Sequence, residues 1–127
     1  MSLKFKVIER GQPGIVGGGT KLFYATTVSD GELTLDGMTT AIEKRCTVNG
    51  ADIRAVLYSM VEVASEALQN GTIVRLGELG SLRMSLSSEG KEKAEDVNAT
   101  AIRGSSIIFT PGPKLKNSLL SMQYHKQ

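Results

Sequence analysis

The last quarter of the chain combines basic side chains with a complete lack of acidic ones. From Val97 to Gln127 there is no Asp or Glu, and the basic residues are Arg103, Lys114, Lys116 and Lys126. A group of cations without acids can neutralise the phosphates of a polyanion. The net charge of the whole chain is only +2, however, and on charge alone an ordinary solvated face explains the pattern equally well.

The other reactive side chains give little indication of a catalytic site. Cys46 is the only cysteine, which excludes an internal disulfide, and no other Cys or His lies near it in the sequence. A half-buried helix residue is therefore favoured over a nucleophile or a metal ligand. His125, the only histidine, lies in a C-terminal tail that we expect to be frayed and solvated. The sequence predicts no enzyme, no metal site, no cofactor and no small-molecule substrate.

A glycine-rich segment, residues 11–20, invites comparison with a phosphate-binding loop. Gly14 and Gly19 have the spacing of such a loop, but Thr20 and Lys21 stand in the reverse of the required Lys-Ser/Thr order. A β-prone run follows, where a phosphate-binding loop would lead into a helix. We interpret the segment as a flexible hairpin loop between strands at residues 3–10 and 21–28.

The composition is that of a single globular domain. The chain has 127 residues, of which 40% are hydrophobic and 22% charged. A domain of this size has a modest core, so dimerisation would help to bury its apolar surface. No apolar run approaches the roughly 20 residues that span a bilayer, and no secretory signal peptide is recognisable. We expect an intracellular, cytoplasmic protein without membrane contact.

Two helices are predicted in the first half of the chain. Thr34 is expected to cap a helix from Leu35 to about Arg45, and Asn49 is expected to cap a second helix of about five turns. The second helix has the strongest periodicity in the chain, with apolar residues at i, i+3, i+4 and i+7 from residue 53 to residue 68. Its wide apolar stripe is typical of a helix that packs on more than one neighbour, as at a dimer interface.

The stretch from residue 71 to residue 82 connects this helix to a strand-rich half. Gly71 stands where a left-handed C-cap is expected, and the residues after it are β-prone and apolar. Gly77 and Gly80 give the backbone freedom for a sharp corner between two strands. The sequence therefore predicts a unit of helix, capped end, strand, glycine corner and strand.

A hairpin and a last helix are expected after the corner. Residues 81–87 alternate apolar and polar, and the return strand contains Ile102 and residues 107–109, with a bulge or break at residues 104–106. The connection is polar, with four acids and two lysines between Glu89 and Asp96, and is expected to be an exposed tip or a mobile loop. A closing helix is expected from Lys114 to about Met122.

Two sequence motifs accompany this order of elements. The first, Gly-x-x-Val-x-Leu-x-x-Leu-Gly-Ser-Leu, covers residues 71–82, and the second, Phe-x-Pro-Gly-x-x-Leu-Lys, covers residues 109–116. Together with the helices and the hairpin, they resemble the bacterial HU/IHF family of histone-like DNA-binding proteins, from about Thr34 to Met122. The added N-terminal strand pair is similar to that of HU-related proteins from Bacteroides-type bacteria.

The resemblance implies an α+β fold that forms an intertwined homodimer with a helical base, a β saddle and two β-ribbon arms around the DNA minor groove. Residues 1–33 would form an N-terminal β-hairpin extension, and residues 34–127 the HU/IHF-like DNA-binding domain. The implied function is architectural, weakly sequence-specific binding of double-stranded DNA, because phosphate neutralisation and DNA deformability would supply the affinity. The implied location is the nucleoid.

The expected site residues are basic positions on the arm and on the closing helix. We expect DNA contacts from Arg83, Lys91, Lys93, Arg103, Lys114 and Lys116. We expect the dimer core to contain Val56, Leu57, Met60, Val61, Ala64, Leu76, Leu79 and Phe109.

The chain departs from the family pattern at three places. Glu78-Leu79-Gly80 replaces the usual Gly-Phe-Gly corner, and Pro113 replaces a lysine. The family's Arg-Asn-Pro-x-Thr-Gly arm tip, whose proline wedges between base pairs, has no counterpart, because the acidic segment stands there instead. A tip without a wedge argues against bending by intercalation. A second hypothesis therefore stays open, an HU-fold structural or protein-interaction module that has lost most DNA binding and whose extra strands offer an edge to a partner.

Overall fold

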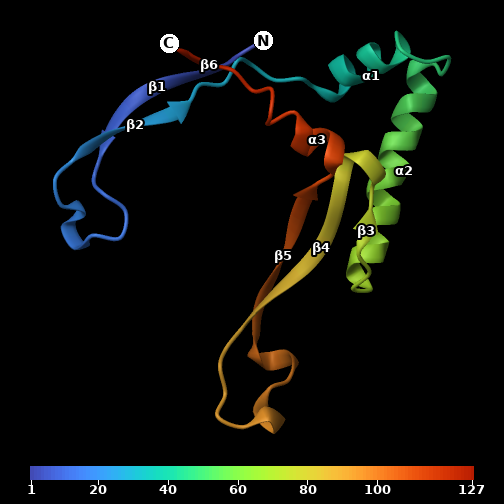
Figure 1. Cartoon of the computed structure of the whole chain (residues 1–127). Coiled ribbons are helices and arrows are strands. Elements are labelled where there is room, and N and C mark those ends of the chain that lie inside the picture. Colours follow the sequence, from blue (N-terminus) through green and yellow to red (C-terminus); the bar gives the residue numbers. More distant parts are fainter.

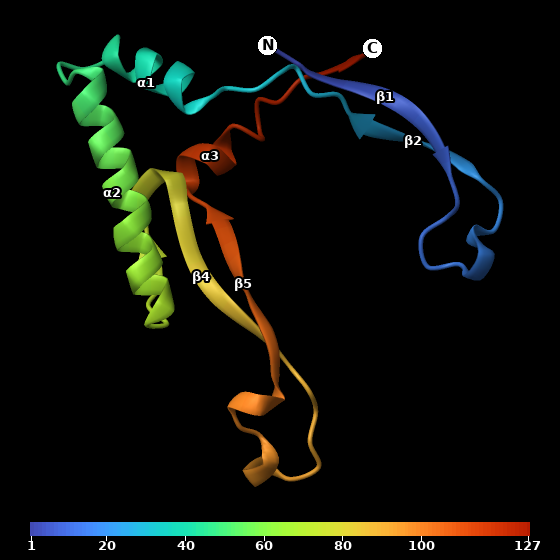
Figure 2. The same ribbon diagram turned by 180° about the vertical axis from the view of Figure 1, so that it is seen from behind.

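The computed structural model describes residues 1–127 and shows an α+β chain with two separate three-stranded sheets. One sheet has the order β2-β1-β6, and its strands are β1 (Leu3–Arg10), β2 (Leu22–Thr27) and β6 (Tyr124–Lys126). The other has the order β3-β4-β5, with β3 (Val74–Arg75), β4 (Gly80–Ser88) and β5 (Ile102–Pro111). Two hairpins extend from the helical part of the molecule, as Figure 1 shows from one side and Figure 2 from behind.

Three helices connect the sheets: α1 (Leu35–Glu43), α2 (Gly50–Gln69) and α3 (Pro113–Asn117). Thr34 and Asn49 cap α1 and α2, as the sequence predicted. Thr34 Oγ1 accepts a hydrogen bond from the Gly37 amide at 3.1 Å, and Asn49 Oδ1 accepts one from the Asp52 amide at 3.0 Å. Each cap satisfies a backbone donor that the first helical turn leaves free.

The C-terminal end of α2 confirms the predicted glycine cap. Gly71 has φ +76°, and its amide donates to the Leu68 carbonyl at 3.0 Å, while the Thr72 amide donates to the Ala67 carbonyl at 2.9 Å. This pair of bonds is the Schellman pattern. The chain then turns back along α2 as β3, which is only two residues long.

The predicted glycine corner is a short 3₁₀ turn, Gly77–Leu79, between β3 and β4. Gly77 has φ +62° and Gly80 has φ +142°, regions that side-chain-bearing residues avoid. A Cβ atom on Gly80 would collide with the Thr110 carbonyl oxygen and the Phe109 ring. The corner therefore allows close packing of the turn on the end of β5.

The β4–β5 hairpin is regular where the sequence predicted an interruption. Residues 104–106 are in continuous pairing with β4, so the predicted bulge or break there is wrong. The irregularity lies at the far end of the arm, where Ser87 pairs with Gly104 but Ser88 pairs with Ile102, which leaves Arg103 as the extra residue. Beyond it, the exposed tip folds into two 3₁₀ turns, Ala94–Asp96 and Ala99–Ala101.

The C-terminal end of the chain also differs from the prediction. The closing helix spans only residues 113–117; Leu119 lies beyond it in a turn, and Met122 lies in the irregular segment before β6. The last residues are not a frayed tail, because β6 pairs in parallel with β1, with Lys4 opposite His125. Both termini therefore lie at the same edge of the molecule (Figure 1). Such a pairing between chain ends leaves no local sequence signal.

Very few side chains are buried. Ile53, Leu68 and Ala101 are the buried hydrophobic residues, and Thr39 is the largest fully buried side chain. Arg54 Nη2 and Asp36 Oδ1, 2.6 Å apart, connect α2 to α1 at the surface. One copy of the chain therefore has only a small core of its own. No helix is both long enough and apolar enough to cross a membrane.

Candidate nucleic-acid interface

The β3-β4-β5 sheet has one apolar face and one polar face. Directly paired residues project to the same side of a sheet. The apolar face contains the pairs Val74–Leu82, Leu82–Phe109 and Met84–Ile107. The polar face contains the pairs Arg75–Ser81, Ser81–Thr110, Arg83–Ile108 and Ser85–Ser106. Alternation in the three strands thus places Arg75 and Arg83 with several hydroxyl groups on one face and most apolar residues on the other, with Ile108 as the apolar member of the polar face.

Arg75 and Arg83 form the cationic part of the polar face. Arg83 lies two residues after Ser81, which pairs with Arg75, so the two arginines are diagonal neighbours whose Cα atoms are roughly 7–8 Å apart. Both are exposed, and neither makes an ion pair. Two unneutralised guanidinium groups at this spacing can contact phosphates of one nucleic-acid strand.

Arg75 is a candidate that the sequence analysis missed. It lines a hollow of about 260 Å³ without hydrophobic residues, together with Ser81, Thr110 and residues of the glycine corner. The alternation of Val74, Arg75 and Leu76 was the available signal. The face on which Arg75 lies became clear only from the register with β4, because a two-residue strand is too short to show a period by itself.

Arg83 and Arg103 were both expected on the arm, and the structure places them in different hollows. Arg103, the extra residue at the bulge, lines a hollow of about 380 Å³ with Ser85, Ser87 and Ser106. Arg83 lines another hollow, near the C-terminal end of α2, with Leu68 and Met84. The arm therefore presents its arginines at two separate places along its length.

Lys114 and Lys116 extend the basic surface beyond β5. Both belong to α3, which begins directly after β5, and both are exposed without an ion pair. The Lys116 amide donates to the Gly112 carbonyl at 2.9 Å, and the Gly112 amide donates to the Leu79 carbonyl at 3.0 Å. These bonds fix the start of α3 against the glycine corner.

The arm tip has a different charge balance. Lys91 Nζ lies 3.2 Å from Glu89 Oε2, so one of the two expected tip lysines is already paired within the chain. Lys93 precedes the 3₁₀ turn of Ala94–Asp96, which carries two further acids. The tip is therefore a weaker partner for phosphate than the sheet face.

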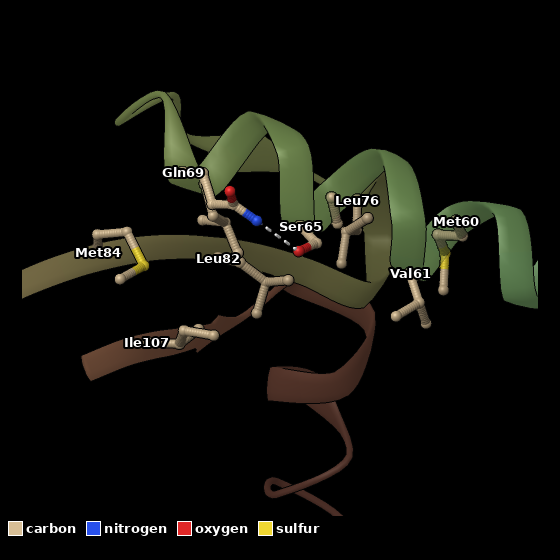
Figure 3. A pocket seen from close by; sticks show the side chains of 10 residues that line it. Met60, Val61, Ser65, Gln69, Leu76, Leu82, Met84 and Ile107 are labelled. Carbon is tan, nitrogen blue, oxygen red and sulfur yellow. Dashed lines mark hydrogen bonds between the residues drawn. The ribbon is translucent and has the colours of Figure 1, made fainter. Parts of the chain in front are cut away.

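The apolar face of the sheet lies opposite α2, and the side chains of the two elements leave space between them. A hollow of about 430 Å³ lies there, with eight hydrophobic residues among its ten lining residues. In Figure 3, Val61 and Met60 of α2 and Leu82 and Ile107 of the strands border the same space. The two polar lining residues are hydrogen-bonded to each other: Gln69 Nε2 donates to Ser65 Oγ at 3.2 Å.

Comparison with known proteins identifies the family of the chain. The model of a family described as an HU domain fused to wHTH, Ig, or a glycine-rich motif matches residues 1–126. The chain belongs to this HU-domain family. The match confirms the resemblance that the two sequence motifs indicated.

A solved structure has the same fold. It is that of a candidate bacterial DNA-binding protein from Bacteroides vulgatus ATCC 8482, with a TM-score of 0.64 and 21% sequence identity. The match covers 98% of this chain and 47% of that protein, so the HU-family chain spans less than half the length of this neighbour. No curated protein matches the chain.

Proposed function

We propose that this chain is an architectural protein that binds double-stranded DNA as a homodimer with weak sequence specificity. The observation that carries the proposal is the polar face of the β3-β4-β5 sheet, where Arg75 and Arg83 stand among hydroxyl groups without a neutralising acid. Cations and hydroxyls of this kind bind the DNA backbone, which positions a protein without reading the base sequence.

The homodimer is supported by the surface area of the single chain. One copy exposes 10482 Å², whereas a compact monomer of this mass exposes about 6,600 Å². Part of the excess belongs to the extended hairpins. The remainder is surface that an interface between two copies can cover; obligate dimers bury on the order of 2,000–5,000 Å² in total over both copies.

The residues expected in the dimer core support the same conclusion. Val56, Val61 and Phe109 remain 65%, 63% and 46% exposed in the single chain. Val61 also borders the open apolar hollow between α2 and the sheet. Since large exposed apolar patches mark interaction surfaces, we assign this region to a second copy of the chain.

Contacts to the backbone would come from the sheet face and from α3 more than from the arm tip. The tip has no proline wedge, and Lys91 is paired with Glu89. Its other acids, Glu92, Glu95 and Asp96, would repel phosphate. We therefore propose DNA binding without intercalative bending at this tip, by a protein located in the nucleoid.

The acidic tip also favours a second candidate function, that of an HU-fold module for protein interaction. In this function the dimer core is kept, most DNA affinity is lost, and the unpaired edge of β2 is available to a protein partner.

Salt-dependent titration of a random-sequence duplex separates the two functions. DNA binding predicts an affinity well above the weak non-specific level of about 10⁻⁴ M and a linear fall of log K with log salt. Lys114→Ala/Lys116→Ala should weaken binding to all sequences alike, whereas Lys44→Ala/Arg45→Ala, which removes the same charge at the end of α1, should not. Weak binding without a salt slope would leave the interaction module as the function.

The same titration on linear, nicked and four-way-junction DNA tests the architectural part of the proposal. A protein that uses DNA deformability binds pre-bent or flexible DNA more tightly, because part of the bending energy is already supplied. Equal affinity for all three forms would reduce the function to simple backbone binding.

A further inference from the structure

The sheet formed by β2, β1 and β6 carries a row of basic residues on one face. β1 is its central strand, and Lys4, Lys6 and Arg10 stand at even positions of β1, so they project to the same side. The register adds Tyr24 and His125 to this side, because Tyr24 pairs with Ile8 and His125 pairs with Lys4. We call this side the basic face.

The opposite side of the sheet has another character. Leu3, Phe5 and Val7 of β1 project there, and Phe23 and Tyr124 join them from the neighbouring strands. Glu9 is the one acid of β1, and it also belongs to this side. The pleat of the sheet therefore separates Glu9 and three of the four apolar residues of β1 from the basic residues, and Ile8 is the one apolar residue of β1 on the basic face.

The basic face keeps most of its charge. Lys4 Nζ lies 3.3 Å from Asp30 Oδ1 and is partly neutralised, whereas Lys6 and Arg10 have no carboxylate in salt-bridge range. The Arg10 guanidinium lies 4.7 Å from the centroid of the Tyr24 ring. A cation–π contact orders the guanidinium but leaves its charge available to a polyanion.

The spacing of the row suits a nucleic-acid backbone. Alternate residues of a strand are roughly 6.6 Å apart, and the row from Lys4 to Arg10 extends over about 20 Å. A DNA strand carries one phosphate per about 3.4 Å of helix axis, so cations in such a row can contact several phosphates of one strand.

The position of this sheet in the molecule is compatible with such contacts. In Figures 1 and 2 the loop end of the β1–β2 hairpin and the tip of the β4–β5 arm point to the same side of the molecule, away from α1 and the termini. We propose that the basic face, through Lys6 and Arg10 above all, is a second surface that contacts the phosphate backbone of double-stranded DNA. This inference rests on the proposed function.

Paired charge-removal variants of the full-length chain test the inference. Lys6→Ala/Arg10→Ala should bind random duplex DNA roughly 25-fold more weakly at 0.15 M salt, about five-fold per lost phosphate contact, and the slope of log K against log salt should become less steep by about 2. Lys44→Ala/Arg45→Ala removes the same charge from the end of α1 and should leave both quantities unchanged.

A single substitution protects the test against a folding artefact. Because Arg10→Ala also removes the contact with Tyr24, Lys6→Glu is measured in parallel, since Lys6 has no ion pair or side-chain hydrogen bond to lose. Lys6→Glu should weaken binding at least about five-fold, and Lys6→Arg should restore wild-type affinity. Circular dichroism should show the same strand content in all variants.

The outcomes separate this inference from the function on which it rests. If Lys114→Ala/Lys116→Ala weakens binding while the Lys6 and Arg10 variants match the wild type, the basic face does not contact DNA and the proposed function stands. If the wild type itself shows no salt-dependent DNA binding, both proposals are wrong.

Discussion

The two faces of the β3-β4-β5 sheet differ in polarity and in charge. One face carries Leu82, Met84 and Ile107 and borders an apolar hollow of about 430 Å³. The other carries Arg75 and Arg83 among serine and threonine hydroxyls. The comparison shows how the period-two alternation of a few short strands can supply both an assembly surface and a polyanion surface. It also implies that the polyanion surface depends on the assembly surface, because a sheet whose apolar face is not covered lacks the packing that holds its strands in place.

The largest effect is expected from a charge on the apolar side. Val61→Lys places an ammonium group at the open hollow, where a second copy would bury it without a partner, at a cost of several kcal/mol. Sedimentation velocity should show loss of the dimer, and chemical denaturation should show a lower free energy of unfolding. Ser59→Lys adds the same charge to the polar side of α2 and should keep the dimer. If Val61→Lys is as stable and as dimeric as Ser59→Lys, the hollow is not the interface.

An intermediate effect is expected from the polar face. Arg75→Ala/Arg83→Ala should lower duplex affinity roughly 25-fold at 0.15 M salt, because two phosphate contacts are lost, each of about five-fold. The dimer should be unaffected, since neither arginine lines the apolar hollow between α2 and the sheet. Fluorescence anisotropy over a series of salt concentrations measures both affinity and slope. An unchanged slope would show that this face does not meet DNA.

The smallest effect is expected at the arm tip. Glu92→Gln/Glu95→Gln/Asp96→Asn removes three negative charges, and affinity should rise a few-fold at low salt only, because exposed charges more than a Debye length apart, about 10 Å at 0.1 M, are screened. The same anisotropy assay at two salt concentrations checks this. Weaker binding after removal of the acids would mean that the tip has a positive role in recognition.

Local signals in the sequence predicted α1 and α2 and the caps at Thr34, Asn49 and Gly71, but not the end of the closing helix at Asn117. Thr34, Asn49 and Gly71 act within one helical turn of their own position, so the residue type and its neighbours determine the cap. The apolar i, i+3, i+4 and i+7 pattern along α2 and the two family motifs could also be seen in the sequence without knowledge of distant contacts. The family assignment from these motifs agrees with the match over residues 1–126.

Features that depend on pairing between distant segments were not predictable in this way. β6 exists only because Tyr124–Lys126 meets β1 at the other end of the chain. The bulge at Arg103, which was expected at residues 104–106, depends on the register between β4 and β5, and a serine-glycine run does not reveal that register. Arg75 was missed for the same reason, since its neighbours on the polar face come from another strand.

The division at residue 33 and the expected dimer-core residues remain predictions. The β2-β1-β6 sheet joins residues from both ends of the chain, so any N-terminal extension includes contacts with residues 124–126. The dimer-core residues Leu57, Ala64 and Leu76 are half-buried in one copy, whereas Val56 and Val61 are mostly exposed, so an added partner would change the exposure of these two valines most clearly.

The most direct test of the account is the mass of the complex that the wild-type chain forms with a short random-sequence duplex, measured by light scattering after size-exclusion chromatography. Completion of the apolar face by a second copy predicts two chains per duplex, and the free protein should have twice the mass of one chain. A complex with a single chain, or no complex at low salt, would contradict the claim that assembly on one face of the sheet creates the DNA-binding surface on the other.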